Sequence, residues 1–168
     1  MSMTTAAVLG TGAWGTTFAQ VLADAGVEVT MWGRNADTVS FINGRENPSY
    51  LPGITLSERI SATGDIADAV EGKPLVVVAV PVKAVRRTLE SARDYLAPEV
   101  VLLSLAKGLE LGTLRRVDEI IADASGVPGR RIAVLSGPNL SREIADRQPT
   151  ATVVASGDVE LAKEIART

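Results

Sequence analysis

The chain has 168 residues, with 17 Lys or Arg and 20 Asp or Glu, so its formal net charge is −3. It contains no Cys and no His. Disulfides, thiol nucleophiles, histidine bases and metal sites built from Cys or His are therefore excluded, and we expect no metal site. The weak negative charge argues against a nucleic-acid binder, and the apolar content of 46% argues against a disordered chain.

No segment is typical of a signal peptide or a membrane span. The first ten residues lack a basic region followed by a long apolar one. The longest apolar run, residues 75–82, is far shorter than the roughly 20 residues that a membrane helix needs. We therefore expect a soluble, cytoplasmic protein that does not insert into membranes.

The first elements along the chain form a recognisable unit. Residues 6–9 predict a strand, and apolar spacing predicts a helix over 14–25 that stops at Gly26. Between them lies a G-x-G-x-x-G motif, Gly10-Thr11-Gly12-Ala13-Trp14-Gly15. In this context Gly10 permits a tight turn, Gly12 lets a pyrophosphate approach the backbone, and Gly15 allows close helix–strand packing. The motif predicts a dinucleotide site, although a glycine-rich turn alone can be a plain connection.

The second strand, residues 28–32, is followed by Gly33 and Arg34. The residue at this strand end contacts the ribose of a bound dinucleotide, and an Arg there favours a 2′-phosphate. Arg34 therefore favours NADP, or use of both NAD and NADP, over NAD alone. The alternative is a solvated loop arginine.

Further strands are expected at 75–80, 100–105 and 132–135, with weaker candidates at 59–63 and 151–155. Helices are expected over 82–96, 113–124, 140–147 and 157–167. Residues 43–56 form the longest irregular stretch, and loops of that length are often functional. The alternation of strands and helices predicts one domain spanning 1–168, with a Rossmann-like, doubly wound α/β fold and a mainly parallel sheet.

Three strand ends after the glycine motif bear candidate site residues, because ligands of open α/β sheets bind beyond the carboxyl ends of the strands. Pro81 is a candidate cofactor contact or a simple helix start. Lys107 could polarise a carbonyl or hold a phosphate, or be an ordinary surface lysine. The segment Ser136-Gly137-Pro138-Asn139 could bind an anion or cap the next helix.

Several motifs occur together in a fixed order. They are Gly10-x-Gly12-x-Trp14-Gly15-Thr16, Trp32-Gly33-Arg34, Asn47-Pro48-x-Tyr50-Leu51-Pro52-Gly53, Val80-Pro81, Lys107-Gly108-Leu109-Glu110 and Ser136-Gly137-Pro138-Asn139. The combination resembles the N-terminal domain of bacterial NAD(P)-dependent sn-glycerol-3-phosphate dehydrogenase, over essentially the whole chain. That family interconverts dihydroxyacetone phosphate and sn-glycerol 3-phosphate, for phospholipid synthesis.

The resemblance implies roles for individual residues. Ala13, Trp14, Arg34 and Ser141 match cofactor-contacting positions of the family. Lys107 matches a catalytic residue shared by cofactor and substrate, and Gly137 and Asn139 match substrate contacts. The segment Asn47–Gly53 matches a family loop to which we assign no specific contact.

One part of the family pattern is missing. Family members continue into a helical C-terminal domain that supplies a second lysine and a phosphate-binding segment, and nothing in this chain matches it. We therefore expect this chain to be a fragment that binds nucleotide and turns over little substrate. We also expect an exposed apolar face where the second domain would pack, and hence self-association, for which a homodimer is one form.

Other functions remain open at this point. The chain could be a nucleotide-binding module without catalysis. It could also belong to a related reductase that uses a lysine, such as a β-hydroxyacid or 6-phosphogluconate dehydrogenase. The segments Trp14-Gly15-Thr16 and 107–110 favour the glycerol-3-phosphate family over these.

Overall fold

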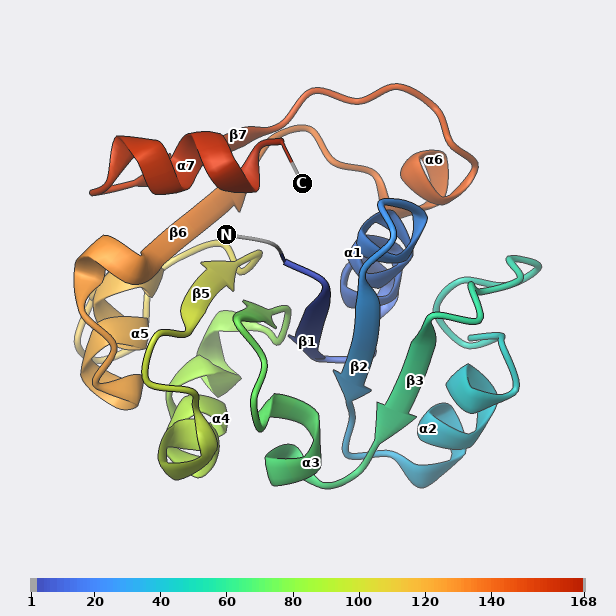
Figure 1. Cartoon of the computed structure of the whole chain (residues 1–168), viewed down its shortest axis with the longest axis horizontal. Coiled ribbons are helices and arrows are strands. Elements are labelled where there is room, and N and C mark those ends of the chain that lie inside the picture. Colours follow the sequence, from blue (N-terminus) through green and yellow to red (C-terminus); the bar gives the residue numbers. More distant parts are fainter. Residues whose placement is uncertain (1–2, 168) are drawn as a thin grey trace.

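The computed structural model describes residues 3–167. Within them lies a seven-stranded sheet with the order β3-β2-β1-β4-β5-β6-β7 (Figure 1). The strands are β1 (Thr5–Leu9), β2 (Glu28–Trp32), β3 (Ile60–Thr63), β4 (Leu75–Val78), β5 (Val101–Ser104), β6 (Ile132–Ser136) and β7 (Val153–Ser156). All neighbouring pairs are parallel except β6 and β7, which are antiparallel.

Helices lie on both faces of this sheet. They are α1 (Ala13–Asp24), α2 (Ala36–Asn43), α3 (Ile66–Val70), α4 (Val82–Ala92), α5 (Val117–Ser125), α6 (Ser141–Ala145) and α7 (Val159–Ile165), with short 3₁₀ turns η1 (Arg93–Tyr95) and η2 (Gly129–Arg131). This is the expected doubly wound α/β fold. The strand order reverses between β1 and β4, so the connections that follow these two strands run in opposite directions and leave a crevice beyond their carboxyl ends.

Two apolar clusters form the core, one on each face. In β1, Ala6 and Val8 pack with α1 on one face, while Ala7 and Leu9 pack with α3, α4 and α5 on the other. This division follows from the two-residue period of a strand. Every residue of β4 and of β5 is buried, because the central strands are covered on both sides.

Some expected bounds were wrong. The strand predicted at 75–80 ends at Val78, because Ala79 lies directly against the glycine-rich turn at Gly10. The helix predicted at 113–124 begins only at Val117, because Leu114 has a φ of 55° and cannot continue a helix. The other predicted helices are present with ends that shift by a few residues.

Helices α2 and α3 were missed in the sequence prediction. Both begin after a capping side chain: Asn35 accepts a hydrogen bond from the backbone N–H of Thr38, and Asp65 accepts one from that of Ala67. Such caps are a recognised start signal. The helices themselves are short, so the apolar periodicity that would have revealed them is weak.

Candidate functional site

The glycine-rich turn joins β1 to α1 and is shaped by close backbone contacts. Gly10 has a φ of 128°, and a methyl group added there would lie 2.8 Å from the carbonyl oxygen of Ala79. A methyl group on Gly15 would lie 2.3 Å from the carbonyl oxygen of Gly10. Side chains at these two positions would overlap backbone atoms, so both glycines are required by the fold itself.

Gly12 is different, because a methyl group added there would meet no atom within 4 Å. Its φ of −73° is also open to other residues. Gly12 stands at the N-cap of α1 and has no side chain that could cap the helix. The first turn of α1 also contains no acidic residue. The open space at Gly12 faces the positive end of a helix, which is the arrangement that receives a phosphate.

A cleft of about 480 Å³ opens at this turn. It is lined by Gly10, Thr11, Gly12, Trp32, Gly33, Arg34, Tyr50, Ala79, Val80, Pro81, Leu105 and Ala106. These residues follow β1, β2, β4 and β5, together with Tyr50 from the irregular segment 43–56. The cleft therefore occupies the crevice at the carboxyl ends of the strands, where open α/β sheets bind their ligands.

The irregular segment supports the turn from outside. Asn47 is only 1% exposed, and its Nδ2 donates hydrogen bonds to the carbonyl oxygen of Thr11 (3.0 Å) and to Oγ1 of Thr16 (2.8 Å). Tyr50, from the same segment, is half-exposed at the cleft. The sequence predicted neither the hydrogen bonds of Asn47 nor the place of Tyr50 at the cleft. Both residues stand in the Asn47–Gly53 motif, but the motif alone does not show which distant segment it packs on.

Lys107 lies just beyond the cleft, directly after the lining residue Ala106. Its Nζ is exposed and donates a hydrogen bond of 3.0 Å to the carbonyl oxygen of Gly137. The fold thus brings together two of the predicted site segments, from the ends of the neighbouring strands β5 and β6. An ammonium group at this position can contact a ligand that extends from the cleft.

Gly137 and Asn139 lie in a bend after β6 that packs against the residues before β7. A methyl group on Gly137 would lie 2.6 Å from the carbonyl oxygen of Ala151, so glycine is required there. Asn139 Nδ2 is 3.5 Å from Oγ1 of Thr152, and its Oδ1 is buried with no hydrogen-bond partner in the described chain. A buried acceptor without a partner is costly, and it marks a place where a donor group would be accommodated.

The segment after Lys107 is anchored to α4 by charge. Arg86 donates two hydrogen bonds to the carboxylate of Glu110, at 2.8 and 2.9 Å, and a third to Asp123 at 2.6 Å. Hydrogen bonds from Arg86 and then from Thr113 lower the pKa of Glu110 to about 2. Arg86 likewise lowers the pKa of Asp123. The backbone that follows Lys107 is therefore tied to a rigid helix.

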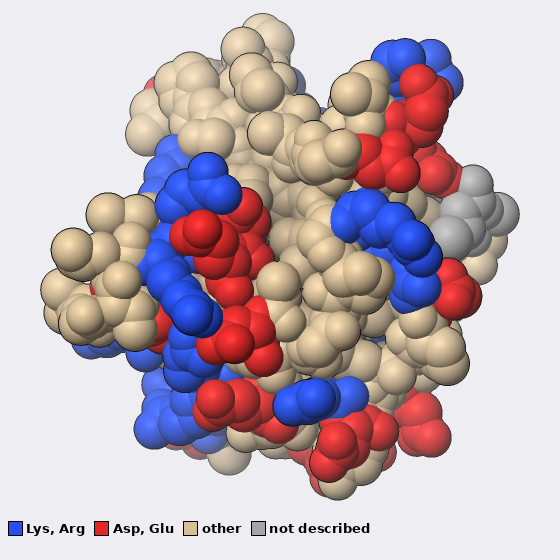
Figure 2. All heavy atoms as spheres, turned by 90° about the vertical axis from the view of Figure 1, so that its left-hand side faces the viewer, with Lys and Arg blue, Asp and Glu red and all other residues tan. Residues whose placement is uncertain are grey.

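The side of the molecule in Figure 2 shows positive and negative side chains interspersed rather than separated by sign. Ion pairs on α5 and around it account for part of this pattern, including Arg115 with Asp123 at 3.0 Å and Arg116 with Asp118 at 3.1 Å. In such pairs each surface charge is balanced by a neighbouring charge of opposite sign.

Of the nine residues predicted to contact a cofactor, five do not line the cleft: Gly15 and Lys107, described above, and also Ala13, Trp14 and Ser141. Ala13 and Trp14 stand in the first turn of α1, where the indole of Trp14 packs edge-on against Phe18 at 5.8 Å between ring centroids. Ser141 begins α6, which lies beside α1 (Figure 1), and its carbonyl oxygen accepts a hydrogen bond from Oγ1 of Thr17. Ala13 and Trp14 thus belong to the start of α1, and Ser141 lies beside its N-terminal half.

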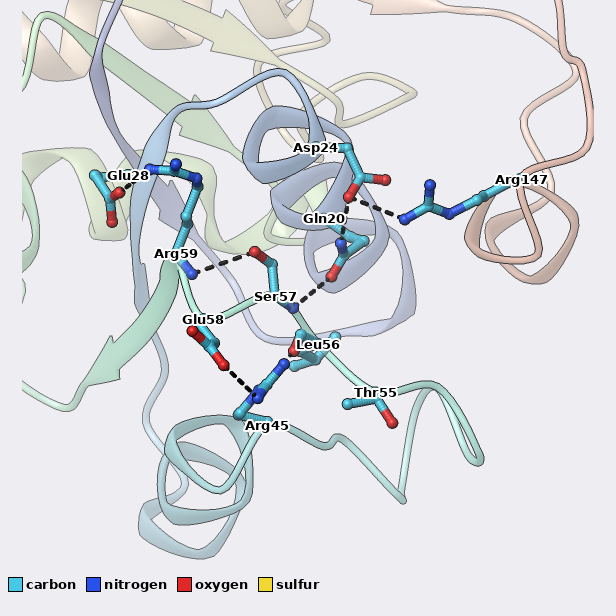
Figure 3. A pocket seen from close by; sticks show the side chains of 10 residues that line it. All are labelled: Gln20, Asp24, Glu28, Arg45, Thr55, Leu56, Ser57, Glu58, Arg59 and Arg147. Carbon is cyan, nitrogen blue, oxygen red and sulfur yellow. Dashed lines mark hydrogen bonds and ion pairs between the residues drawn. The ribbon is translucent and has the colours of Figure 1, made fainter.

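A second hollow, of about 630 Å³, lies near the amino-terminal ends of β2 and β3 (Figure 3). Its arginines each face a carboxylate: Arg45 with Glu58, Arg59 with Glu28, and Arg147 with Asp24. Gln20 donates a hydrogen bond to Asp24 and accepts one from the backbone N–H of Ser57. These contacts satisfy one another and tie the segment before β3 to α1, so the hollow is a structural feature.

Metal binding and membrane insertion are two further possibilities for residues 3–167. No group of three or more acidic side chains is arranged to hold a metal ion there. None of the described helices has the length and apolar character needed to cross a membrane.

Residues 5–162 match the family described as "NAD-dependent glycerol-3-phosphate dehydrogenase N-terminus". The chain belongs to this family. The family expected from the sequence is thereby confirmed, and the alternative of another lysine-using reductase is set aside.

Individual relatives agree with the family match. The chain is 52% identical over 162 residues to a glycerol-3-phosphate dehydrogenase [NAD(P)+] of Thermobifida fusca, covering 95% of this chain and 48% of that protein. It is 50% identical over 161 residues to one of Streptomyces griseus, with the same coverage. The structure superimposes on glycerol-3-phosphate dehydrogenase from Coxiella burnetii with a TM-score of 0.89 at 30% identity, covering 97% of this chain and 50% of that one. The chain thus spans about half the length of the relatives it matches.

Proposed function

We propose that this chain binds NAD(P)(H) in the cleft and forms the cofactor-binding part of an NAD(P)-dependent glycerol-3-phosphate dehydrogenase. The observation that supports this most strongly is the continuity of the cleft. It extends from Gly12, at the N-terminal end of α1, to Ala106, the residue before Lys107. A dinucleotide needs an anion site at one point and a reactive group at another, and the cleft joins the two.

The residues present fit such a cofactor. The space at Gly12 and the free N–H groups of the first turn of α1 would hold the pyrophosphate. Arg34, at the end of β2, would face the ribose of the adenosine half. Pro81 and Ala106 would border the other half of the dinucleotide. When bound, the cofactor supplies or accepts the hydride.

The chain's own contribution to the chemistry centres on Lys107. In the proposed reaction dihydroxyacetone phosphate, NAD(P)H and a proton give sn-glycerol 3-phosphate and NAD(P)+. The ammonium of Lys107 would donate a hydrogen bond to the substrate carbonyl and stabilise the negative charge that develops on its oxygen. The carbonyl oxygen of Gly137, 3.0 Å from Nζ, orients this ammonium. Gly137 and Asn139 would contact the substrate from the neighbouring strand end.

We assign the complete activity to a longer protein, since the relatives are about twice as long as this chain. Three leucines after Lys107 support an added packing surface: Leu109, Leu111 and Leu114 are 49%, 87% and 72% exposed. Exposed apolar groups of this kind mark interaction surfaces. In the 168-residue chain the same leucines would favour self-association, and a homodimer and a cytoplasmic location both stay predictions.

A fluorescence titration of this chain with NADH and NADPH tests the proposal. We expect saturable binding of at least one of the two nucleotides, together with little turnover of dihydroxyacetone phosphate. A chain that folds, as judged by a cooperative thermal transition, and binds neither nucleotide would overturn it.

A further inference from the structure

A third hollow, of about 310 Å³, adjoins the cofactor cleft. It shares four lining residues with the cleft: Trp32, Arg34, Val80 and Pro81. Its other four come from one helix, α4: Ala84, Arg87, Thr88 and Ser91. The hollow is thus a side extension of the cleft, entered past the end of β2, and we call it the α4 extension.

The helical residues of the α4 extension lie on one face. Their spacing of three, four and seven residues from Ala84 places them together along a helix. Thr88 and Ser91 are short, so the exposed side chain of Arg87 is the long, charged group that α4 presents to the hollow. Val85, Leu89 and Ala92 of α4 are buried in the core, so the helix is firmly placed.

The charge of the α4 extension is unbalanced. It is lined by two arginines and by no carboxylate. Within the described part of the chain, neither Arg34 nor Arg87 forms a hydrogen bond or an ion pair through its side chain. The next residue along the helix shows the contrast, because Arg86 is bound to both Glu110 and Asp123. Two free guanidinium groups around one hollow attract an anion and repel each other in its absence.

We propose that Arg87 acts with Arg34 to bind the 2′-phosphate of NADP(H), which makes Arg87 a second specificity-determining residue. The inference rests on the proposed cofactor site, because the end of β2 is where the adenosine ribose of a dinucleotide lies. A phosphate on that ribose would extend toward α4. Arginine suits it, since the guanidinium donates two parallel hydrogen bonds to phosphate oxygens.

This arrangement gives a direction to the cofactor preference. NAD has a hydroxyl at the ribose 2′-position and leaves both arginines without a counter-charge. NADP supplies the counter-charge, so the α4 extension favours NADP over NAD. Arg34 alone would give a weaker preference than the pair.

The test uses nucleotides that differ only in the 2′-phosphate. Adenosine 2′,5′-bisphosphate and adenosine 5′-monophosphate are titrated calorimetrically into the wild-type chain, Arg87→Gln and the matched control Lys83→Gln. Lys83 is an exposed residue of α4 that does not line the α4 extension. Its substitution removes the same charge from the same helix. NADH and NADPH titrations of each protein accompany these, and a thermal transition confirms folding.

We expect Arg87→Gln to weaken binding of the bisphosphate by about 10- to 100-fold, which corresponds to the loss of one or two charge-assisted hydrogen bonds. Its affinity for the monophosphate and for NADH should change by less than about threefold, and Lys83→Gln should behave as wild type. An equal loss for both adenosine nucleotides, or an equal loss in Lys83→Gln, would overturn the role of Arg87 while leaving the cofactor site in place. Failure of the wild-type chain to bind NADH and NADPH would instead overturn the proposed function and this inference with it.

Discussion

Replacement of Gly12 by alanine separates ligand binding from folding at the glycine-rich turn. A methyl group at this position meets no protein atom within 4 Å, and the backbone φ of −73° suits alanine. The methyl group instead occupies the space that a pyrophosphate needs next to the backbone. We therefore expect Gly12→Ala to fold normally and to bind nucleotide poorly.

The magnitudes follow from two opposing effects on stability and one on binding. Alanine is a poorer N-cap than glycine, but it also lowers the conformational entropy of the unfolded chain, which stabilises by about 0.4–1 kcal/mol. The net change should stay below about 1 kcal/mol, or a few degrees in Tm for a chain of this size. Loss of one charge-assisted hydrogen bond to the pyrophosphate costs roughly 1.5–3 kcal/mol, which weakens binding by about 10- to 100-fold.

Two companion variants sharpen the comparison. Gly129→Ala is the matched control, because a methyl group there also meets nothing within 4 Å and lies far from the cleft. Gly15→Ala is the opposite case: its methyl group would lie 2.3 Å from the carbonyl oxygen of Gly10, and such overpacking costs about 1–3 kcal/mol or more. Thermal unfolding and NADPH fluorescence titrations give both quantities. The reasoning is refuted if Gly12→Ala binds NADPH as wild type does, or if Gly129→Ala weakens binding equally.

Three other predictions concern the surroundings of the cleft. Asn47→Ala should lose about 1–3 kcal/mol of stability and several degrees in Tm, because two buried hydrogen bonds are lost; a Tm within a degree of wild type would contradict this. Glu110 has a pKa held near 2 by Arg86, below its ordinary value, so its ion pair stabilises the fold above about pH 4.5 and is lost as pH falls toward 2. The Tm difference between wild type and Glu110→Gln should therefore shrink over that range. Glu143→Gln should show no comparable trend, because the Glu143 carboxylate has no ion-pair partner among residues 3–167. In the longer protein, Lys107→Met should lower kcat by about 10²- to 10⁴-fold with little change in NADPH affinity, and an unchanged kcat would exclude Lys107 from the chemistry.

Much of the fold follows from local patterns in the sequence. Unbroken apolar runs such as 75–78 predict buried strands, and the glycine motif between a strand and a helix predicts the turn at Gly10. These features depend on residue spacing and on backbone sterics, which operate within a few residues. Short elements are the exception. Helices α2 and α3 have clear caps, but they were missed because their apolar periodicity is too brief to reveal them.

The contacts that shape the site depend on tertiary structure. Asn47 reaches Thr11 across 36 positions of the chain, and Lys107 reaches Gly137 across 30. Arg34 and Arg87 border one hollow although they belong to different elements. The strand order places these segments together, with β1 next to β4 and β5 next to β6. That order results from burying both faces of the sheet through crossover connections, a property of the whole chain that no local spacing encodes.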